Sequence, residues 1–238
     1  MITKWCCMNN FYFPAHHEKL RDQNLEFNRL YAYPSVPSIN DKKIILDSGA
    51  FHMHKARKKI DSAYVGALVK HYKKYQHLEN VYCIAADTPK NFNKSLEITR
   101  LMLQSIPLLC PVLHNPKKHK IDLFSIKKQI KAYAALCSNR FIALSNNSLD
   151  IYRDFESIKH CVQLAKNEFR HVHIFGAGYT ADEVKKWQET GADSVDSIGY
   201  YTDASSGVAL DGDYSKARGF LELSLKNLLE LNRLCKKN

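Results

Sequence analysis

Short apolar runs alternate with longer amphipathic segments along most of this chain. From residue 43 onward the runs are rich in β-forming residues and the segments between them have helical spacing, a pattern typical of repeated βα units around a parallel sheet. The predicted strands are Lys43 to Leu46, Val81 to Ala86, Leu108 to Leu113, Phe141 to Leu144, Val172 to Phe175 and Asp193 to Val195. Ile2 to Cys7 is expected to form a first strand, and a weaker signal at Val208 to Leu210 an eighth. We therefore expect residues 1–238 to form a single α/β domain, a (β/α)₈ barrel of the TIM type rather than an open doubly wound sheet.

Helix signals fill the segments between these strands. Asp61 is a possible N-cap, and the residues behind it that recur on one helical face are Tyr64, Leu68, Tyr72 and Tyr75. Thr180 with Glu183 resembles a capping box that opens a later helix. The tail from Tyr214 to Leu234 has the spacing of a long amphipathic helix.

The balance of basic and acidic residues indicates which class of partner the protein could bind. The chain has 35 Lys plus Arg against 24 Asp plus Glu, a formal net charge of +11, so its surface field should attract a polyanion. Nucleic acid is the leading partner class, although an excess of lysine that only keeps the protein soluble explains the charge equally well. The net charge alone therefore does not establish nucleic-acid binding, and a functional site must support it.

Other features of the sequence argue against a disulfide-rich protein, a membrane protein and a nucleotide cofactor. Seven cysteines without a Cys-x-x-Cys pair indicate buried thiols in a reducing cytoplasm rather than a disulfide framework. No segment approaches the roughly 20 apolar residues that span a bilayer, so we expect a soluble, cytoplasmic protein with no membrane partner. Gly176-Ala-Gly178 lacks the third glycine of a dinucleotide fingerprint, and no Gly-x-x-x-x-Gly-Lys occurs. We therefore expect no nucleotide cofactor.

Polar residues follow the predicted strands at the point where each strand ends. Chemistry in a parallel barrel lies at this edge, where the βα loops begin. Each aspartate taken alone is as well explained as a helix cap or a turn residue, but their recurrence at successive strand ends indicates a site. The segments are Asp47-Ser-Gly-Ala-Phe51, Asp87-Thr-Pro89, His114-Asn115, Ser145-Asn-Asn147, Gly176-Ala-Gly178 and Asp196-Ser197.

Several of these segments resemble motifs of the tRNA-guanine transglycosylase superfamily. Asp47-Ser-Gly-Ala-Phe51 is similar to the family's Asp-Ser-Gly-Gly-Phe/Tyr, and Asp87-Thr-Pro89 lies where the family has an Asp followed closely by Thr-Pro. His173-Ile-Phe-Gly-Ala-Gly178 resembles the family's Leu-Met-Gly-Val-Gly. Thr180-Ala-Asp-Glu-Val and then Gly191-Ala-Asp-Ser-Val-Asp196 follow Thr-Pro-Glu-Asp-Leu and Gly-Val-Asp-x-Phe-Asp in order and nearly in spacing. The resemblance covers roughly residues 43 to 197.

The resemblance implies a role for each matching residue. Asp196 would be the nucleophile that forms a covalent glycosyl enzyme while guanine leaves, and Asp47 the general acid/base that handles the proton of the outgoing and incoming bases. Two carboxylates around a glycosidic carbon also make chemical sense without the family. Asp87 would accept hydrogen bonds from guanine, and the remaining predicted substrate-binding residues are Phe51, Phe175, His114, Ser145, Asn146, Gly176 and Gly178. Ordinary barrel packing is the alternative for the two phenylalanines.

The chain also departs from the family. After Asp196 it has one Cys and no His, so the family's zinc site is absent, and Ser197-Ile-Gly-Tyr-Tyr-Thr202 replaces the Pro-Thr-Arg segment used on RNA. His114 stands in for the Gln of the purine pocket, and Ser145-Asn146 for a Gly-Gly. The pairs His52 with His54 and His171 with His173 could suggest a metal, but we expect none.

The absence of the zinc site and of the Pro-Thr-Arg segment favours DNA over tRNA as the substrate. The compact relatives that exchange guanine in DNA for a 7-deazaguanine (preQ0-like) base are similarly reduced, and the second substrate would be free guanine or the 7-deazaguanine base. An extruded or single-stranded base would enter the barrel mouth while basic loops hold the backbone. The candidate contacts are Lys55, Arg57, Lys58, Lys59, Lys117, Lys118 and Lys120, for which a solvated helix start is an equal alternative.

Three other functions remain open at this point. The first is an RNA transglycosylase with a separate recognition partner. The second is a non-catalytic accessory subunit of such an enzyme, which the retention of both Asp47 and Asp196 opposes. The third is a metal-dependent barrel hydrolase that uses the histidine pairs.

Overall fold

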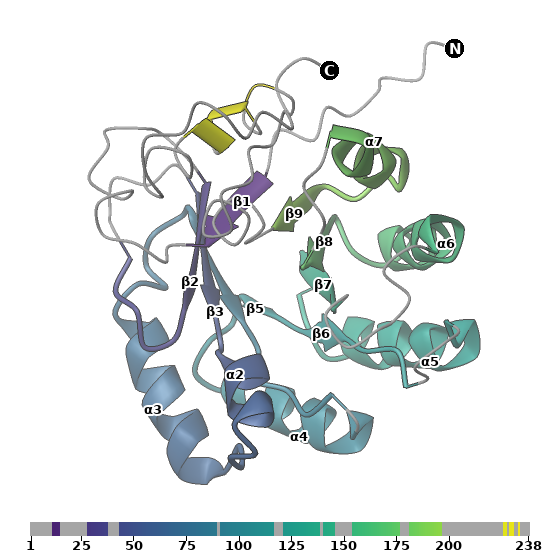
Figure 1. Ribbon diagram of the computed structural model, residues 1–238. Coiled ribbons are helices and arrows are strands. Elements are labelled where there is room, and N and C mark those ends of the chain that lie inside the picture. Colours follow the sequence, from purple (N-terminus) through teal and green to yellow (C-terminus); the bar gives the residue numbers. More distant parts are fainter. Residues whose placement is uncertain are drawn as a thin grey trace.

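The computed structural model describes residues 11–14, 28–37, 43–89, 91–116, 121–138, 140–145, 154–176 and 181–196, with residues 226–227, 229–230 and 233 near the end of the chain. These residues form a mixed α/β structure in which helices lie in an arc around parallel strands (Figure 1). The predicted α/β class is confirmed.

All strand pairs in the described residues are parallel, and the sheet order is β5-β4-β3-β2-β1-β9-β8-β7-β6. The strands are β1 (Phe11–Pro14), β2 (Asn28–Ala32), β3 (Lys43–Asp47), β4 (Val81–Ile84), β5 (Leu109–Cys110), β6 (Val112–Leu113), β7 (Phe141–Ser145), β8 (His171–Phe175) and β9 (Ser194–Asp196). Parallel strands place their carboxyl ends at one edge, so the residues after β3, β4, β6, β7, β8 and β9 share an edge of the sheet.

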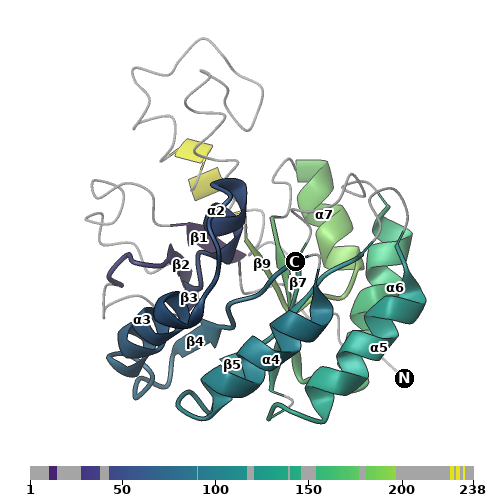
Figure 2. The same ribbon diagram turned by 90° about the horizontal axis from the view of Figure 1, so that it is seen from below.

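The helices follow one another around the outside of the strands, as the second view also shows (Figure 2). They are α2 (Ala50–Lys55), α3 (Ser62–Lys73), α4 (Phe92–Leu103), α5 (Leu123–Ala134), α6 (Phe155–Lys166) and α7 (Ala181–Glu189). Four of them begin at an Asp or Asn whose side chain accepts a hydrogen bond from a backbone N–H of the first turn, which satisfies a donor that has no partner inside the helix. These N-caps are Asp61, Asn91, Asp122 and Asp154.

The two strands at the ends of the sheet order are consecutive in the chain. Only Pro111 separates β5 from β6. Pro111 has no backbone N–H, so it interrupts the ladder, but its carbonyl still accepts from the Ala143 N–H at 3.0 Å, and the Cys110 carbonyl accepts from Ala85 at 2.8 Å. Strand pairing among the described residues thus gives an order with two ends, and closure as a barrel is not shown.

Buried side chains lie on both faces of the sheet. Two clusters pack the helices against the strands, and a third gathers side chains of β2 to β8 on the opposite face. In that third cluster the Tyr82 ring of β4 stacks on the Phe141 ring of β7, with 4.8 Å between centroids. Strands that are not neighbours in the sheet therefore meet through their side chains.

Some elements differ from those the sequence predicts. The strands β1 and β2, between β9 and β3, were not expected, and the predicted strand Leu108 to Leu113 is divided at Pro111. Asp61 caps α3 as predicted, with the Tyr64 N–H at 2.9 Å, although the helix ends at Lys73 before Tyr75. Outside the described residues lie the predicted strands Ile2 to Cys7 and Val208 to Leu210, residue Thr180, and most of the tail from Tyr214 to Leu234.

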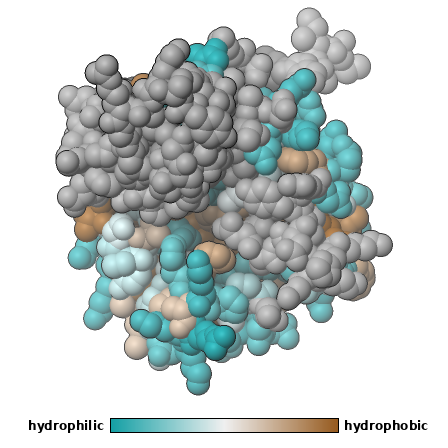
Figure 3. All heavy atoms as spheres, viewed as in Figure 1, coloured by the Kyte–Doolittle hydropathy of each residue, from teal (hydrophilic) through white to brown (hydrophobic). Residues whose placement is uncertain are grey.

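The polarity of the surface and the burial of the cysteines are as expected from the amino-acid composition. On the face seen in Figure 3 most of the described side chains are hydrophilic, and hydrophobic ones are scattered. No helix within the described part of the chain is long and apolar enough to cross a bilayer. Cys83, Cys110 and Cys161 are buried free thiols, and burial raises the pKa of Cys83 and Cys161 to about 12, which suits packing rather than nucleophilic chemistry.

Candidate functional site

Three aspartates lie at the carboxyl ends of three strands. Asp47 is the last residue of β3, Asp196 is the last residue of β9, and Asp87 follows β4 by three residues. Asp87 and Asp196 are buried and Asp47 is partly buried. The negative charges of Asp87 and Asp196 both contribute to the electrostatic environment of Asp47. The structure therefore brings together the three carboxylates that the sequence singled out.

Asp47 has an unusual proton affinity for a carboxyl group. Burial raises its pKa from 3.8 to about 7, the Asp87 and Asp196 charges raise it further, and hydrogen bonds from the Gly49 and Ser48 backbone partly oppose the rise. The Gly49 N–H lies 3.3 Å from Oδ2. A carboxyl group with a pKa near 7 can both give and take a proton at neutral pH, which is what general acid/base catalysis requires.

The turn after Asp47 explains the glycine of its motif. Gly49 has φ +70° at the start of α2, a conformation that disfavours side chains. A Cβ at this position would also lie 3.1 Å from the Tyr33 carbonyl oxygen. The Tyr64 hydroxyl donates a short hydrogen bond to the Ser48 carbonyl, which fixes the same turn from α3.

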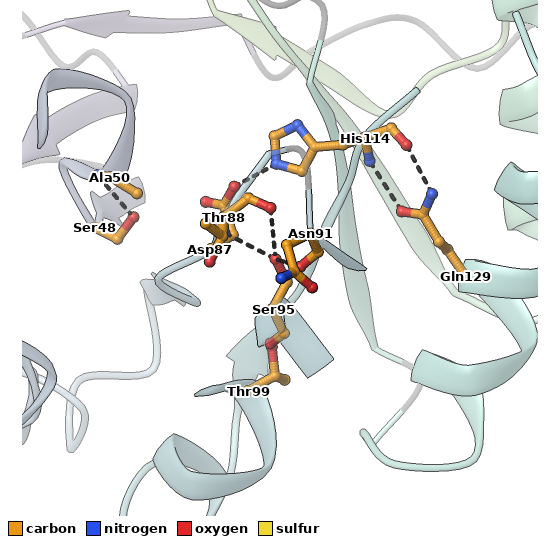
Figure 4. Close-up of polar contacts among 9 residues, drawn as sticks. All are labelled: Ser48, Ala50, Asp87, Thr88, Asn91, Ser95, Thr99, His114 and Gln129. Carbon is orange, nitrogen blue, oxygen red and sulfur yellow. Dashed lines mark hydrogen bonds and ion pairs between the residues drawn. The ribbon is translucent and has the colours of Figure 1, made fainter. Parts of the chain in front are cut away.

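Asp87 is held by a histidine from a neighbouring strand end (Figure 4). The His114 Nε2–H donates a short hydrogen bond to Asp87 Oδ2, and both side chains are buried. Gln129 of α5 fixes the backbone of His114 from both sides: its Oε1 accepts from the His114 N–H at 3.1 Å and its Nε2 donates to the carbonyl at 2.7 Å. His114 Nδ1 is buried without a hydrogen-bond partner among the described residues, so in this tautomer it is an acceptor that they leave unused.

The loop after Asp87 is tied to the start of α4. Ser95 Oγ accepts from the Thr88 N–H at 2.8 Å and lies 3.1 Å from the Thr88 carbonyl (Figure 4). A cavity of about 350 Å³ opens here between the first turns of α4 and α5. His114 and Gln129 line it together with Thr88, Ser95 and Lys128, among other residues, whereas none of the three aspartates does. The cavity therefore flanks the aspartate cluster on the His114 side.

Asp196 receives two hydrogen bonds on the same oxygen. The His173 Nε2–H donates to Asp196 Oδ1 at 3.2 Å, and the Gly176 N–H donates to the same atom at 3.2 Å. His173 is fully buried on β8, next to β9. Gly176 has φ +69°, so its turn after β8 favours glycine. Gly176, which the sequence predicts to bind substrate, also supports Asp196 through its amide.

A chain of hydrogen bonds continues behind Asp196. Ser194 Oγ lies 2.8 Å from His173 Nδ1 and 2.6 Å from His171 Nε2. Burial is the main cause that lowers the pKa of His171 to about 4, and the charge of Asp193 partly opposes this. His171 is therefore neutral at pH 7.

The two phenylalanines that are predicted to bind substrate lie on different elements. Phe51 projects from α2 with 45% of its side chain exposed. Phe175 ends β8, is partly buried, and packs edge-on against the His173 imidazole at 4.8 Å between centroids. Their rings do not contact each other in the described structure. Ser145, at the end of β7, is buried beside Phe175 in the strand register.

The predicted phosphate contacts are described only in part. Lys55, Arg57, Lys58 and Lys59 are exposed at the end of α2 and in the loop after it. Outside the described residues lie Lys117, Lys118, Lys120, Asn146 and Gly178. The described basic cluster thus follows Asp47 along the chain and is open to solvent.

The histidine pairs do not form a metal centre in the part of the chain that is described. No group of three or more His, Cys, Asp or Glu residues there could hold a metal ion. The rings of His171 and His173 bind Ser194 and Asp196, and His52 contacts Phe51.

Sequence reasoning missed several supporting residues. His171 and His173 were noted only as a possible metal pair, and Ser194 and Gln129 were not considered. The signal for the first two was present, because residues two apart in a strand share a face, here the face that also carries Ser194 and Asp196 of β9. Gln129 follows His114 by fifteen residues on a helix, a distance at which the sequence gives no signal.

The sequence matches none of the protein-family models against which it was scanned, and a search of the curated proteins finds no match.

Proposed function

We propose that this protein exchanges guanine in a nucleic acid, with DNA as the preferred substrate, for a 7-deazaguanine base through a covalent glycosyl-aspartate intermediate. The observation that carries the proposal is the group of three aspartates at the carboxyl ends of three parallel strands, one of which has its pKa raised to about 7 by burial and by the other two. Base exchange needs a nucleophile, a proton carrier and an acceptor for the guanine edge, and this group supplies one carboxylate for each task.

The roles follow from the environment of each aspartate. Asp196 attacks the anomeric carbon, the glycosidic bond breaks, and its electron pair leaves with guanine. Asp47 gives a proton to the leaving base and takes one from the incoming base. Both tasks suit a group with a pKa near neutral pH. The resemblance of the motifs around Asp47 and Asp196 to guanine transglycosylases supports the same assignment.

Asp87 and His114 suit the guanine edge. Guanine presents its N1–H and 2-amino group as donors, and Asp87 is an acceptor while it remains ionised. His114 Nδ1 is a second buried acceptor without a partner, next to the same carboxylate. A buried acceptor left unpaired is unfavourable, so a ligand that donates to it would be stabilised.

We also propose that the strands close into the (β/α)₈ barrel expected from the sequence. If β5 and β6 are taken as one strand interrupted at Pro111, the nine strands become eight, and the two ends of the order meet. The stacking of Tyr82 on Phe141 across the inner cluster supports closure. The aspartates would then surround the mouth of the barrel, where such folds carry their chemistry.

Support for DNA as the substrate comes from the net charge of +11 and from the exposed basic cluster that follows Asp47. RNA is the alternative with the same chemistry. The remaining alternatives are weakened by observations on the site: a metal-dependent hydrolase by the engagement of His171 and His173 with Ser194 and Asp196, and a non-catalytic subunit by the raised pKa of Asp47.

Trapping the intermediate tests the proposal. Denaturation of the protein during turnover with an oligonucleotide that contains guanine should leave a protein–DNA adduct, and mass spectrometry should place it on Asp196. Asp196→Asn should form no adduct while it still binds the oligonucleotide. An adduct on another residue, or exchange at the wild-type rate in Asp196→Asn, would contradict the proposal.

A further inference from the structure

The hydrogen-bond chain behind Asp196 has only one consistent direction. An ionised Asp196 can only accept, so the imidazole nitrogen that faces it, His173 Nε2, must carry a proton. A neutral His173 then has a bare Nδ1, which accepts from the Ser194 hydroxyl at 2.8 Å. Ser194 Oγ in turn accepts from the Nε2–H of His171 at 2.6 Å. The proton of each donor therefore points along the chain toward Asp196.

Burial makes this direction hard to reverse. His173 and Ser194 are both 0% exposed, and His171 is partly buried. Reversing the chain would aim a lone pair of His173 at the carboxylate in a region that water does not reach, which is costly. The lowered pKa of His171, about 4, keeps its ring neutral at pH 7, and in this chain its single N–H is then on Nε2.

The two oxygens of Asp196 have different surroundings. Oδ1 receives both the His173 and the Gly176 hydrogen bonds, whereas Oδ2 has no hydrogen-bond partner among the described residues. Donors on Oδ1 withdraw charge from it and fix the plane of the carboxylate. Oδ2 lacks these donors and keeps more of the negative charge, so it is the better placed oxygen for attack.

We infer that His173, oriented by Ser194 and His171, is a positioning residue that fixes Asp196 so that Oδ2 is the attacking oxygen. This inference rests on the proposed function. In the forward step the Oδ2–C1′ bond forms and the C1′–N9 bond breaks, with the electron pair leaving on guanine and the proton for that base coming from Asp47. In the return step N9 of the incoming base forms a bond to C1′ and its proton goes to Asp47, while the Oδ2–C1′ bond breaks and its electron pair returns to a carboxylate that His173 already stabilises.

Nitrogen-15 NMR of the histidine-labelled, full-length protein tests the direction of the chain without any substrate. His173 should show a protonated Nε2 and an unprotonated Nδ1 at pH 7. Ser194→Ala removes the donor to Nδ1, so the Nδ1 signal of His173 should shift to that of an imidazole nitrogen without a hydrogen bond, while Nε2 stays protonated toward Asp196. A protonated Nδ1 in the wild-type protein, or no change in Ser194→Ala, would overturn the inference.

Kinetics test the positioning role. His173→Leu should lower the rate of base exchange at saturating DNA by roughly 10- to 100-fold, because a hydrogen bond to a charged group is lost, while the KM for DNA stays within about twofold. His173→Gln places an N–H donor near the same point and should restore most of the rate. The matched control His71→Leu changes a buried histidine of α3 that is outside the site and should leave the rate unchanged.

The outcomes separate the two proposals. An active wild-type protein in which His173→Leu keeps its full rate, or in which His173→Gln is no better than His173→Leu, overturns the positioning role and leaves the proposed function standing. A wild-type protein that exchanges no base in any nucleic acid overturns the proposed function and, with it, the role of His173.

Discussion

Burial of the Asp47 carboxyl group disfavours the folded protein at neutral pH, but it also gives the group a pKa that suits proton transfer. Its burial next to two other aspartates disfavours the charged form and moves its pKa to about 7. The folded protein therefore keeps this proton up to about pH 7, whereas the unfolded chain loses it near pH 3.8. The free energy of unfolding must then fall as the pH rises between these two values, and the whole penalty is present above about pH 7.

Asp47→Asn should thus raise stability while it abolishes function. The variant has no charge to bury, so at pH 8 we expect it to be more stable than the wild-type protein by as much as about 4 kcal/mol, and nearly equal to it at pH 4. Thermal unfolding at the two pH values measures the difference. Asp61→Asn, at an exposed N-cap that Asn also suits, is the control. A wild-type protein whose stability does not fall between pH 4 and pH 8 relative to Asp47→Asn would show that Asp47 is not buried in this way.

Asp87 and His114 should set the base preference. Asp87→Asn replaces an acceptor with a group that also donates, so guanine should lose about 1 to 3 kcal/mol for each mispaired contact, or roughly 5- to 150-fold in exchange rate. His114→Gln introduces the residue that the resembling family carries at this position and should keep the preference for guanine. Competition between guanine and adenine in the exchange reaction measures both variants. An unchanged preference in Asp87→Asn would refute the role of this carboxylate.

At the scale of elements, one tyrosine joins the two strands that carry Asp47 and Asp87. Tyr72 of α3 is fully buried, and its hydroxyl lies 2.9 Å from the Leu46 carbonyl of β3 and 2.8 Å from the Ile84 carbonyl of β4. Tyr72→Phe leaves the packing in place but removes the donor from two buried acceptors. The ends of β3 and β4 then lose a hydrogen-bond donor that they share, and Asp47 and Asp87 lose the support of that contact.

Tyr72→Phe should therefore destabilise the protein by about 0.5 to 1.5 kcal/mol and also lower the exchange rate. Urea unfolding and exchange kinetics measure the two effects. Tyr75→Phe, in the turn after α3, serves as the control that changes a partly buried tyrosine away from these strands. Loss of stability without any change in rate would mean that the contact supports the fold but does not position the aspartates.

The elements that the sequence predicts well are those with a strong local signal. Strands β3, β4, β7 and β8 are apolar runs buried on both faces, and α3 begins at a recognisable cap. Strand β2 gave no such signal because it contains Asn28 and Arg29, which are buried although polar. Polar residues in a buried strand are stabilised by tertiary partners, which periodicity does not reveal.

The residues of the candidate site also divide into those that the sequence predicts and those that it does not. Asp47, Asp87 and Asp196 could be found because each ends a strand or closely follows one, and parallel topology then brings strand ends together. The partners of these aspartates could not be found, since the His173 contact with Asp196 and the Gln129 contact with His114 depend on register and helix placement. The contact of the Gly176 amide with Asp196 was not expected either, because a motif gives residue types but not the direction of an amide.

At the scale of the whole molecule, the charge should appear in the salt dependence of DNA binding. The logarithm of affinity should fall with the logarithm of salt concentration by roughly 0.9 for each duplex phosphate that is neutralised. Changing Lys55, Lys58 and Lys59 to Gln should flatten this slope and weaken binding without changing which base is removed. Fluorescence anisotropy over a range of salt concentrations measures the slope.

A matched variant controls for net charge. Lys70, Lys73 and Lys74 are exposed at the end of α3, which leads to the start of β4 and therefore lies at the opposite edge of the sheet from the aspartates. Changing these three to Gln removes the same charge and should alter the slope much less. Equal effects of the two triple variants would mean that binding follows net charge rather than a surface beside the site.

The most direct test of the central claim is the incorporation of a labelled base. Radiolabelled guanine and a labelled 7-deazaguanine are offered to the protein with duplex DNA, single-stranded DNA and unmodified tRNA in parallel, with Asp196→Asn as the inactive control. We predict that label enters DNA only with the wild-type protein, and that unlabelled guanine is released in equal amount. Incorporation into tRNA alone would contradict DNA as the substrate, and no incorporation into any nucleic acid would contradict base exchange itself.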